Sequence, residues 1–227
     1  MPHVPFQPTL FDRDPVSVDA AFSTLKRVQL DADAWVDHAP GWVRGSDRLF
    51  LDLLDARDWG QRTRWMYDRR VPEPRLTDAW EAGSGEPLAP PVLEEMRALL
   101  AARYGVRFDS AGFNLYRDGR DSVAWHGDRI DPAVAHPVVA LVSLGEPRRF
   151  LLRPRGGGPS TAFLAGRGDL LVMGGTTQRS WEHAVPKVAR AGTRLTVAFR
   201  HDRDPAAYER RLAGPAARRE GDGCEHA

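Results

Sequence analysis

The second half of the chain is a succession of short apolar runs, and this pattern limits the possible folds more than any other feature. The runs are separated by Gly, Pro and Asp, without helical patterns between them, and they cover residues 113–117, 138–144, 150–153, 169–173 and 194–200. Several short strands at turn-marked spacing indicate a β-sandwich or barrel. We therefore expect a mainly β fold with flanking helices, of the α+β class.

A helix is predicted ahead of these strands, over residues 91–104. Its apolar residues recur at i, i+3, i+4 and i+7, Pro91 leads it and Gly105 follows it, as in an amphipathic helix with start and stop signals. The proline-broken residues 1–20 are expected to form an extended arm. Residues 21–203 are expected to form a single domain, and the charged residues 204–227 a polar tail.

Composition excludes several classes of protein. The chain has 227 residues, of which 42% are hydrophobic and 28% are charged, as in ordinary globular proteins. No apolar run approaches the roughly 20 residues needed to cross a bilayer, and the first residues lack the features of a signal peptide. The single cysteine, Cys224, allows no disulfide within the chain. We expect a cytoplasmic monomer without a membrane partner. The scarcity of lysine (Lys26 and Lys187 only) is typical of GC-rich bacterial genomes.

Charge is distributed unevenly, although the net charge is only +1. Residues 147–200 contain ten basic side chains and only two acidic ones, Asp169 and Glu182. A basic face attracts polyanions, of which nucleic acid is the commonest. The alternative is a solvated, arginine-rich surface without a ligand.

Candidate metal ligands follow one of the apolar runs. His126 and Asp128 stand two residues apart with Gly127 between them, and His183 follows a later predicted strand. Two histidines and one carboxylate on adjacent strands would form a facial triad with open coordination positions, which is typical of non-haem Fe(II) oxygenases. The alternative for His126 and Asp128 is a turn whose polar side chains face water.

The last predicted strand has two different faces. Because side chains alternate along a strand, Leu195, Val197 and Phe199 share one face, and the other face carries Arg194, Thr196, Ala198 and Arg200. The two arginine Cα atoms would lie about 20 Å apart. Guanidinium binds carboxylate through paired hydrogen bonds, so two arginines reaching toward each other could grip both ends of a small dicarboxylate. The alternative is a pair of solvent-exposed strand residues.

These motifs occur in an order that resembles the AlkB family of Fe(II)- and 2-oxoglutarate-dependent dioxygenases. The family pattern runs N-x-Y, then Gly and Asp, then H-x-D, a distal His and finally R-x-N-x-T-x-R, and the match covers about residues 60–201. The resemblance implies a double-stranded β-helix, or jelly roll, with its catalytic core at about residues 105–201 and an N-terminal extension that forms a substrate lid. It also implies oxidative removal of alkyl groups from bases of DNA or RNA, with O2 as co-substrate, in bacterial DNA repair.

The resemblance implies a role for each matching residue. His126, Asp128 and His183 would bind Fe(II). Cofactor contacts would come from Arg194 at the distal carboxylate of 2-oxoglutarate, from Arg200 near its metal-chelating end, and from Asn114, Tyr116 and Thr196. Residues 64–75 resemble the substrate lid. Candidate substrate contacts are Trp65, Tyr67, Arg75, Trp125 and Asp131. An aromatic residue of the lid would stack on a flipped base; the alternative for Trp65 and Tyr67 is a place in the core.

The chain departs from the family pattern at three positions. Thr196 replaces an asparagine and Ala198 a threonine, both at secondary cofactor contacts. Ile130 stands where many nucleic-acid demethylases carry an acidic residue that reads the base, and Asp131 follows one position later. Two alternatives therefore remain: an oxygenase acting on a protein or small molecule, and a non-catalytic nucleic-acid-binding module.

The arm contains Gln7-Pro8-Thr9-Leu10-Phe11, which resembles the Q-x-x-L-F peptide by which bacterial repair proteins bind the sliding clamp. A proline-stiffened segment can present Leu10 and Phe11 to an apolar pocket at a reduced ordering cost. The alternative is an arm whose apolar residues dock on its own domain.

Overall fold

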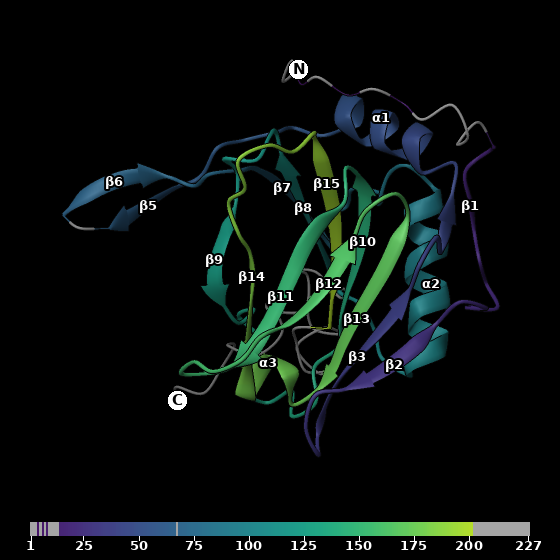
Figure 1. Ribbon diagram of the computed structural model, residues 1–227. Coiled ribbons are helices and arrows are strands. Elements are labelled where there is room, and N and C mark those ends of the chain that lie inside the picture. The colour runs from purple at the N-terminus through teal and green to yellow at the C-terminus, as the bar shows by residue number, and fades with distance from the viewer. Residues whose placement is uncertain (1–3, 5, 7, 9–13, 67, 202–227) are drawn as a thin grey trace, which may run out of the picture.

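Two antiparallel sheets face each other in the computed structural model, which describes residues 4, 6, 8, 14–66 and 68–201 (Figure 1). The larger sheet has seven strands in the order β2-β3-β13-β10-β15-β8-β7. In that order the strands are Lys26–Gln29, Ala34–Ala39, Asp169–Gly175, Val139–Gly145, Arg194–Arg200, Ser110–Tyr116 and Leu76–Glu81.

The smaller sheet has four strands in the order β12-β11-β14-β9. These strands are Thr161–Ala165, Arg148–Pro154, Trp181–Val185 and Val123–His126. A short helix, α3 (Thr177–Ser180), connects β13 of the larger sheet to β14 of the smaller one. Two facing antiparallel sheets are the arrangement of a jelly roll, so the predicted fold class is confirmed.

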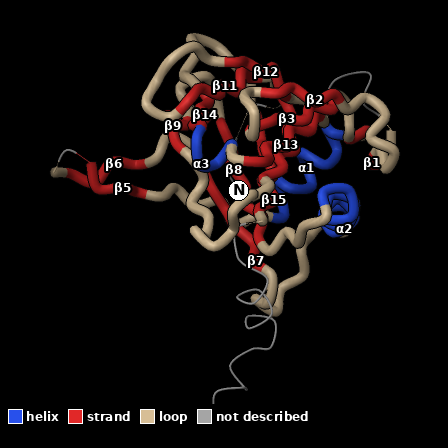
Figure 2. Tube along the Cα trace, turned by 90° about the horizontal axis from the view of Figure 1, so that it is seen from below, coloured by secondary structure: helices blue, strands red, loops and turns tan. Residues whose placement is uncertain are grey.

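The helices α1 (Ser46–Ala56) and α2 (Val92–Tyr104) lie on the side of the larger sheet that faces away from the smaller sheet (Figure 2). The outer face of the sheet and the buried faces of the helices form one apolar core, which includes Leu49, Leu93, Leu100 and Phe199. A second apolar cluster lies between the two sheets and includes Leu141, Phe150 and Met173. The larger sheet is therefore covered on both sides.

The predicted strands and the predicted helix are confirmed with shifts of a few residues at their ends. The strand Arg194–Arg200 has the predicted bounds, and α2 begins one residue later than expected and ends before Gly105, which has a left-handed φ of 66°. Several elements ahead of β7 were not predicted from the sequence. They include β3, α1, β1 (Ser17–Val18) and β4 (Val43–Arg44).

A two-stranded hairpin, β5 (Thr63–Met66) and β6 (Arg69–Pro72), projects from the body of the molecule at the side where β9 lies (Figure 1). This hairpin contains most of residues 64–75, which resemble the substrate lid of the family. Trp65 on this hairpin is 70% exposed, so the alternative interpretation of Trp65 as a core residue is wrong. Tyr67 lies outside the described residues.

Part of the N-terminal arm packs on the domain. The ring of Phe6 stacks on Phe50 of α1 at a centroid distance of 4.0 Å, and Val4 contacts the same core. Of the clamp-like motif, Gln7, Thr9, Leu10 and Phe11 lie outside the described residues, as does the predicted tail from residue 204. None of the described helices has the length and apolar composition needed to span a membrane.

A buried carboxylate joins α2 to the larger sheet. Asp37 of β3 is 1% exposed and accepts hydrogen bonds from Arg27 Nε and Nη2 (2.7 and 2.8 Å) and from the Tyr104 hydroxyl (3.0 Å). Burial and the neighbouring Asp37 charge raise the pKa of Tyr104, so its hydroxyl remains a donor. Trp35, on the same face of β3, stacks on Tyr104.

We predict that Tyr104→Phe destabilises the fold without affecting the cavity between the sheets. The substitution removes a hydrogen bond to a charged, buried group, and such bonds contribute roughly 1.5–3 kcal/mol. The free energy of unfolding, measured by urea denaturation, is expected to fall by about that amount. Because Asp37 lies on the face of β3 turned away from the smaller sheet, metal affinity should stay at the wild-type value. An equally stable variant would contradict this account.

Candidate metal and dicarboxylate site

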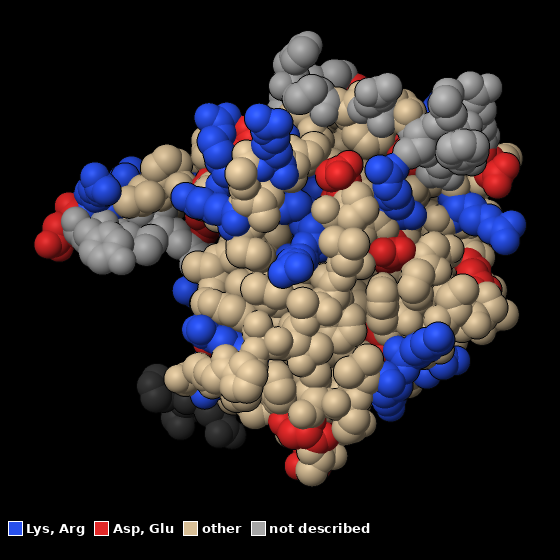
Figure 3. Space-filling model, in the orientation of Figure 1, with Lys and Arg blue, Asp and Glu red and all other residues tan. Residues whose placement is uncertain are grey.

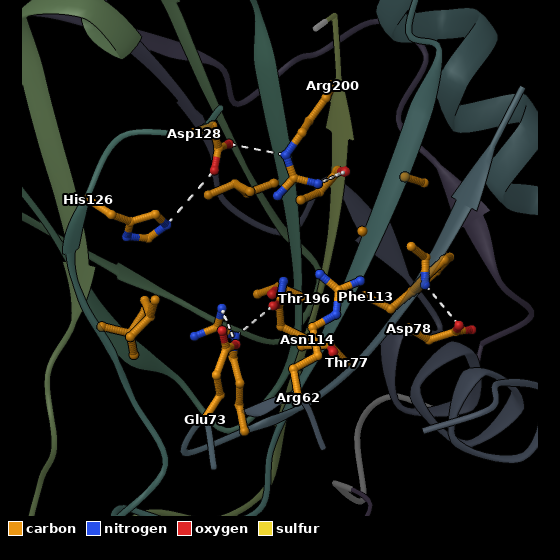
Figure 4. Close-up of a pocket in the computed structure, with 18 of the residues that line it drawn as sticks. Arg62, Glu73, Thr77, Asp78, Phe113, Asn114, His126, Asp128, Thr196 and Arg200 are labelled. Carbon is orange, nitrogen blue, oxygen red and sulfur yellow. Dashed lines mark hydrogen bonds and ion pairs between the residues drawn. The ribbon is translucent and has the colours of Figure 1, made fainter. Parts of the chain in front are cut away.

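A cavity of about 910 Å³ lies between the two sheets and opens toward the hairpin. Strands β8 and β15 of the larger sheet form one wall, and β9, β11 and β14 of the smaller sheet contribute the other. Small-molecule sites commonly measure about 300–1,000 Å³, so the cavity can hold a small dicarboxylate and part of a second molecule. Asn114 of β8, Thr196 and Arg200 of β15 and His126 of β9 point into it (Figure 4).

The three candidate metal ligands converge at one end of this cavity. His126 of β9 and His183 of β14 are direct partners in the antiparallel register. Asp128 Oδ1 lies 3.8 Å from His126 Nε2 and 4.0 Å from His183 Nε2, and the three ligand atoms all lie within 4.8 Å of one another. The predicted juxtaposition of two histidines and a carboxylate on adjacent strands is therefore present.

The surroundings of the two imidazoles orient the His126 ring and keep the buried His183 ring neutral. His126 Nδ1 contacts the carbonyl oxygen of Ala124 at 2.9 Å, so with the proton on Nδ1 the lone pair of Nε2 faces the cavity. Burial lowers the pKa of His183 to about 4. Its ring stacks on Phe150 at 5.2 Å. Neutral imidazole is the form that binds a metal, and His183 presents it at pH 7.

The carboxylate of Asp128 is held by an arginine from the opposite sheet. Arg200 Nε donates to Asp128 Oδ2 at 3.2 Å, while Oδ1 faces the imidazoles. Burial alone would raise the pKa of Asp128, but the charge of Arg200, with smaller electrostatic contributions from His183 and His126, outweighs burial and lowers the pKa. Gly112 makes room for this arginine, because a Cβ there would lie 2.5 Å from Arg200 Nη1. The structure thus gives Arg200 a partner within the protein.

The other end of β15 carries a buried arginine that faces the same cavity. Arg194 is 1% exposed, and its Nη2 donates to Ser143 Oγ at 2.9 Å. Its Nε and Nη1 atoms have no hydrogen-bond partner among the described residues. Burial lowers the pKa of Arg194 to about 10, so the guanidinium stays charged at neutral pH. A buried charge with unused donors fits an anionic ligand.

Polar side chains line the cavity wall between the two arginines. In the sheet register Tyr116 pairs with Arg194, and Asn114 pairs with Thr196 on one side and with Thr77 of β7 on the other. The Asn114 Oδ1 atom accepts a hydrogen bond from Arg75 Nε at 3.0 Å. All the predicted cofactor contacts therefore lie on one face of β8 and β15.

The donor set fits the groups that the motifs imply. Two neutral imidazoles and one carboxylate are the facial set that binds non-haem Fe(II), and the unused donors of Arg194 fit a carboxylate of 2-oxoglutarate. The alternative of a water-facing turn for His126 and Asp128 disagrees with the burial of the Asp128 side chain, which is 9% exposed.

The candidate substrate contacts divide into two groups. Trp65 and Arg75 line the cavity on its hairpin side. Trp125 instead packs against the guanidinium of Arg153, at 4.0 Å from the ring centroid, and Arg153 of β11 pairs with Glu182 on the outer face of the sheet. Asp131 uses its carboxylate to accept the Ala133 N–H in a local turn. Neither Trp125 nor Asp131 is among the residues that line the cavity, and their contact with the substrate stays a prediction.

The expected basic face is smaller than the sequence indicates. Arg148 and Arg194 are 3% and 1% exposed and point inward, and Arg153 and Arg200 are paired with carboxylates. The exposed basic residues of this part of the chain are Arg149, Arg155, Arg167, Lys187 and Arg190. Basic side chains gather at the end of the molecule where β14 leads into β15 (Figure 3).

Several cavity residues were not predicted from the sequence. Glu73 is 7% exposed and lies 3.1 Å from Arg75 Nη2, and Arg62 and Arg129 line the same cavity. Nothing in their local sequence distinguishes them from loop charges. Gly112 could have been found, since a glycine inside a strand commonly marks a close approach of another group.

Comparisons with known proteins agree with this geometry. Residues 59–211 match the model of the 2OG-Fe(II) oxygenase superfamily. Alpha-ketoglutarate-dependent dioxygenase alkB homolog 3 of Rattus norvegicus is 34% identical over 169 residues, which cover 65% of this chain and 57% of that protein. DNA oxidative demethylase ALKBH2 of Arabidopsis thaliana is 32% identical over 191 residues, which cover 66% of this chain and 60% of that protein.

A comparison with solved structures finds a similar fold. The solved structure of OsALKBH1 is 17% identical with a TM-score of 0.53, over 77% of this chain and 99% of that chain, which is a likeness of fold. The chain spans 57% and 60% of the lengths of the two curated relatives described above. The family model covers more than half of the chain, and its residues include the whole cavity. The chain belongs to the 2OG-Fe(II) oxygenase superfamily and, within it, to the AlkB family.

Proposed function

We propose that this protein is an Fe(II)- and 2-oxoglutarate-dependent dioxygenase that removes alkyl groups from nitrogen atoms of DNA bases, in DNA repair. The observation that carries the proposal is the pairing, in one cavity, of the His126, Asp128 and His183 cluster with the buried donors of Arg194. The names of two relatives, a dioxygenase and a DNA oxidative demethylase, support the same reaction.

The overall reaction consumes one O2 and one 2-oxoglutarate. When bound, Fe(II) would allow O2 to act as the oxidant, so that one oxygen atom enters the succinate formed from 2-oxoglutarate, with loss of CO2, and the other enters the substrate. The alkyl carbon on the base nitrogen gains a hydroxyl group, and the resulting hemiaminal breaks its C–N bond to release an aldehyde, which is formaldehyde when the alkyl group is a methyl group. The base nitrogen regains its proton or lone pair.

The residues of this chain would bind and orient the reactants. Arg194 would pair with the distal carboxylate of 2-oxoglutarate, and Tyr116 and Asn114 would flank it on β8. Arg200 would hold Asp128 in place and lend positive charge to the metal-chelating end of the cofactor. Since the protein's part in such chemistry is mainly orientation and enclosure, the rigid register of β8 and β15 is the relevant property.

The substrate would enter from the side of the hairpin. Trp65 lies at the cavity and is 70% exposed, so its ring is available to stack on a base. Arg62 and Arg75 also line this side and would pair with phosphate or base oxygens. RNA remains a second possible polymer. We further propose a cytoplasmic, bacterial, monomeric protein, and the Gln7–Phe11 segment as a sliding-clamp ligand.

Loss of a metal ligand should abolish turnover without unfolding the chain. His126→Ala and Asp128→Ala each remove one of three ligands from a scaffold whose apolar clusters do not include either residue. Succinate formation, followed with a coupled assay, is expected to fall below detection, while circular dichroism stays that of the wild type. Wild-type turnover in either variant would exclude the triad.

Loss of Arg194 should weaken cofactor binding. A charge-assisted pair contributes roughly 1.5–3 kcal/mol, so Arg194→Met is expected to raise the dissociation constant of 2-oxoglutarate by about 10- to 100-fold at 1.4 kcal/mol per factor of ten. Calorimetry with Mn²⁺ in place of Fe(II) measures this constant. Arg149→Met, at an exposed position of β11, is the matched control and should bind normally. An unchanged constant in Arg194→Met would place the distal carboxylate elsewhere.

The substrate class is tested with a panel of methylated oligonucleotides. Single-stranded and duplex DNA and RNA, each carrying one methylated base, are incubated with the enzyme, and released formaldehyde and the mass loss of one CH2 unit are measured. We expect both signals with DNA. Succinate formation without demethylation of any oligonucleotide would favour a protein or small-molecule substrate. Metal-free protein that binds oligonucleotides without any turnover would favour the non-catalytic module.

A further inference from the structure

The loop that carries Asp128 receives little support from either sheet. Residues 127–138 contain no strand, although Asp128 must hold its carboxylate beside two imidazoles that are fixed by paired strands. A metal ligand on such a segment needs other contacts to fix its backbone. These contacts come from α3, the short helix just before β14.

Gln178 of α3 contacts the backbone of the ligand itself. The Asp128 N–H donates to Gln178 Oε1 at 3.0 Å, and Gln178 is 3% exposed. The amide group of Gln178 is held in this orientation on its other side, because its Nε2 donates to the thioether sulfur of Met173 at 3.4 Å. Met173 belongs to the apolar cluster between the sheets. The acceptor for the Asp128 N–H is therefore fixed by the core.

The next residue of α3 holds the remainder of the loop. The guanidinium of Arg179 donates to the carbonyl oxygens of Asp131 (2.7 Å), Val134 (2.8 Å) and Ile130 (3.4 Å). Gln178 and Arg179 thus engage backbone groups at both ends of residues 128–134. Gly127 contributes close packing, since a Cβ there would lie 2.8 Å from Arg155 Nη2 and 3.2 Å from the Gln178 carbonyl oxygen.

We propose that Gln178 is a positioning residue for the metal: its side-chain oxygen fixes the backbone of Asp128 so that the carboxylate meets His126 and His183. The proposal rests on the assignment of these three residues as the metal site. Gln178 lies five residues before His183, in the helix that leads into β14. One short segment therefore supplies the second histidine and also holds the backbone of the carboxylate ligand. The hydrogen bond from the Asp128 N–H to Gln178 Oε1 thus connects the segment that carries Asp128 to the segment that carries His183.

The test is metal binding by the apoprotein, which needs no turnover. Gln178→Met keeps the size and burial of the side chain but removes the acceptor oxygen. Loss of outer contacts of this kind typically lowers metal affinity about 10- to 100-fold, and we expect the Mn²⁺ dissociation constant, measured by calorimetry, to rise by that factor. Hydrogen exchange of the Asp128 amide should accelerate in the same variant. Gln178→Glu retains an acceptor oxygen and should bind Mn²⁺ more tightly than Gln178→Met.

Thr177→Val is the matched control. Thr177 is the neighbouring residue of α3, is 2% exposed, and donates to the carbonyl oxygens of Gly174 (2.5 Å) and Trp35 (3.2 Å) without contacting the loop. It should lower the melting temperature of the apoprotein and leave the Mn²⁺ affinity unchanged, which separates positioning of the ligand from stability of the helix. If Gln178→Met does not fold, Gln178→Ala removes the same oxygen with less crowding and replaces it.

The outcomes separate this proposal from the proposed function. Wild-type protein that fails to bind Mn²⁺ would refute the metal site itself. Wild-type binding together with an unchanged affinity in Gln178→Met and Gln178→Ala would refute the positioning role alone, as would a Gln178→Glu variant that binds as weakly as Gln178→Met.

Discussion

The buried carboxylate of Asp128 is the group on which the cavity depends. A carboxylate taken out of water is costly unless it is paired and hydrogen-bonded. Here one oxygen faces two imidazoles of the smaller sheet, and the other accepts from Arg200 of the larger sheet. The same pairing lowers the pKa of Asp128, which keeps the group ionised as a ligand. Because its partners lie on opposite sheets, the carboxylate also links the two walls of the cavity.

The two faces of β15 have different roles, because successive side chains of the strand alternate between the apolar core and the cavity. Its apolar face packs Leu195, Val197 and Phe199 against the helical side of the molecule. Its other face presents Arg194 and Arg200 to the cavity. Burying two arginines is tolerable only because each has an anionic or polar counterpart: Asp128 for Arg200, and for Arg194 a serine hydroxyl and the anionic ligand that its unused donors fit. The two guanidinium charges that the fold must stabilise are thus the ones proposed to hold the cofactor and the metal ligand.

The period of two along the strands predicted β15, the inward arginines and the cavity face of β8 from sequence, because alternation is a local property of the backbone. The orientation of Trp125 could not be predicted in this way. The register shifts between the pairs His183–His126 and Val185–Val123. The step from one pair to the other takes three residues along β9 but only two along β14. Such a bulge reverses the alternation. It turns His126 toward the metal site and leaves Trp125 on the outer face.

The contacts of α3 were equally invisible in the sequence, for a different reason. Gln178 lies 50 residues from its partner Asp128, and a glutamine before a strand has no period or spacing that marks it. The inward burial of Arg148 has the same origin, since its guanidinium donates to the backbone carbonyls of Asp118, Asp121 and Pro186, which only the fold brings together. The motifs therefore identified the three metal ligands. The residues that fix the backbone around them could be found only in the structure.

The residues proposed to contact the cofactor lie in the seven-stranded sheet, whereas Trp65, proposed to contact the substrate, lies in the projecting hairpin. Arg75 connects these two parts of the molecule. Asn114, Tyr116 and Arg194 lie in strands with full register on both sides, whereas Trp65 lies on a two-stranded hairpin that projects from the body. Arg75 contacts Asn114 through Nε and Glu73, at the base of the hairpin, through Nη2. One guanidinium group therefore links the strand that carries Asn114 to the segment at the base of the hairpin.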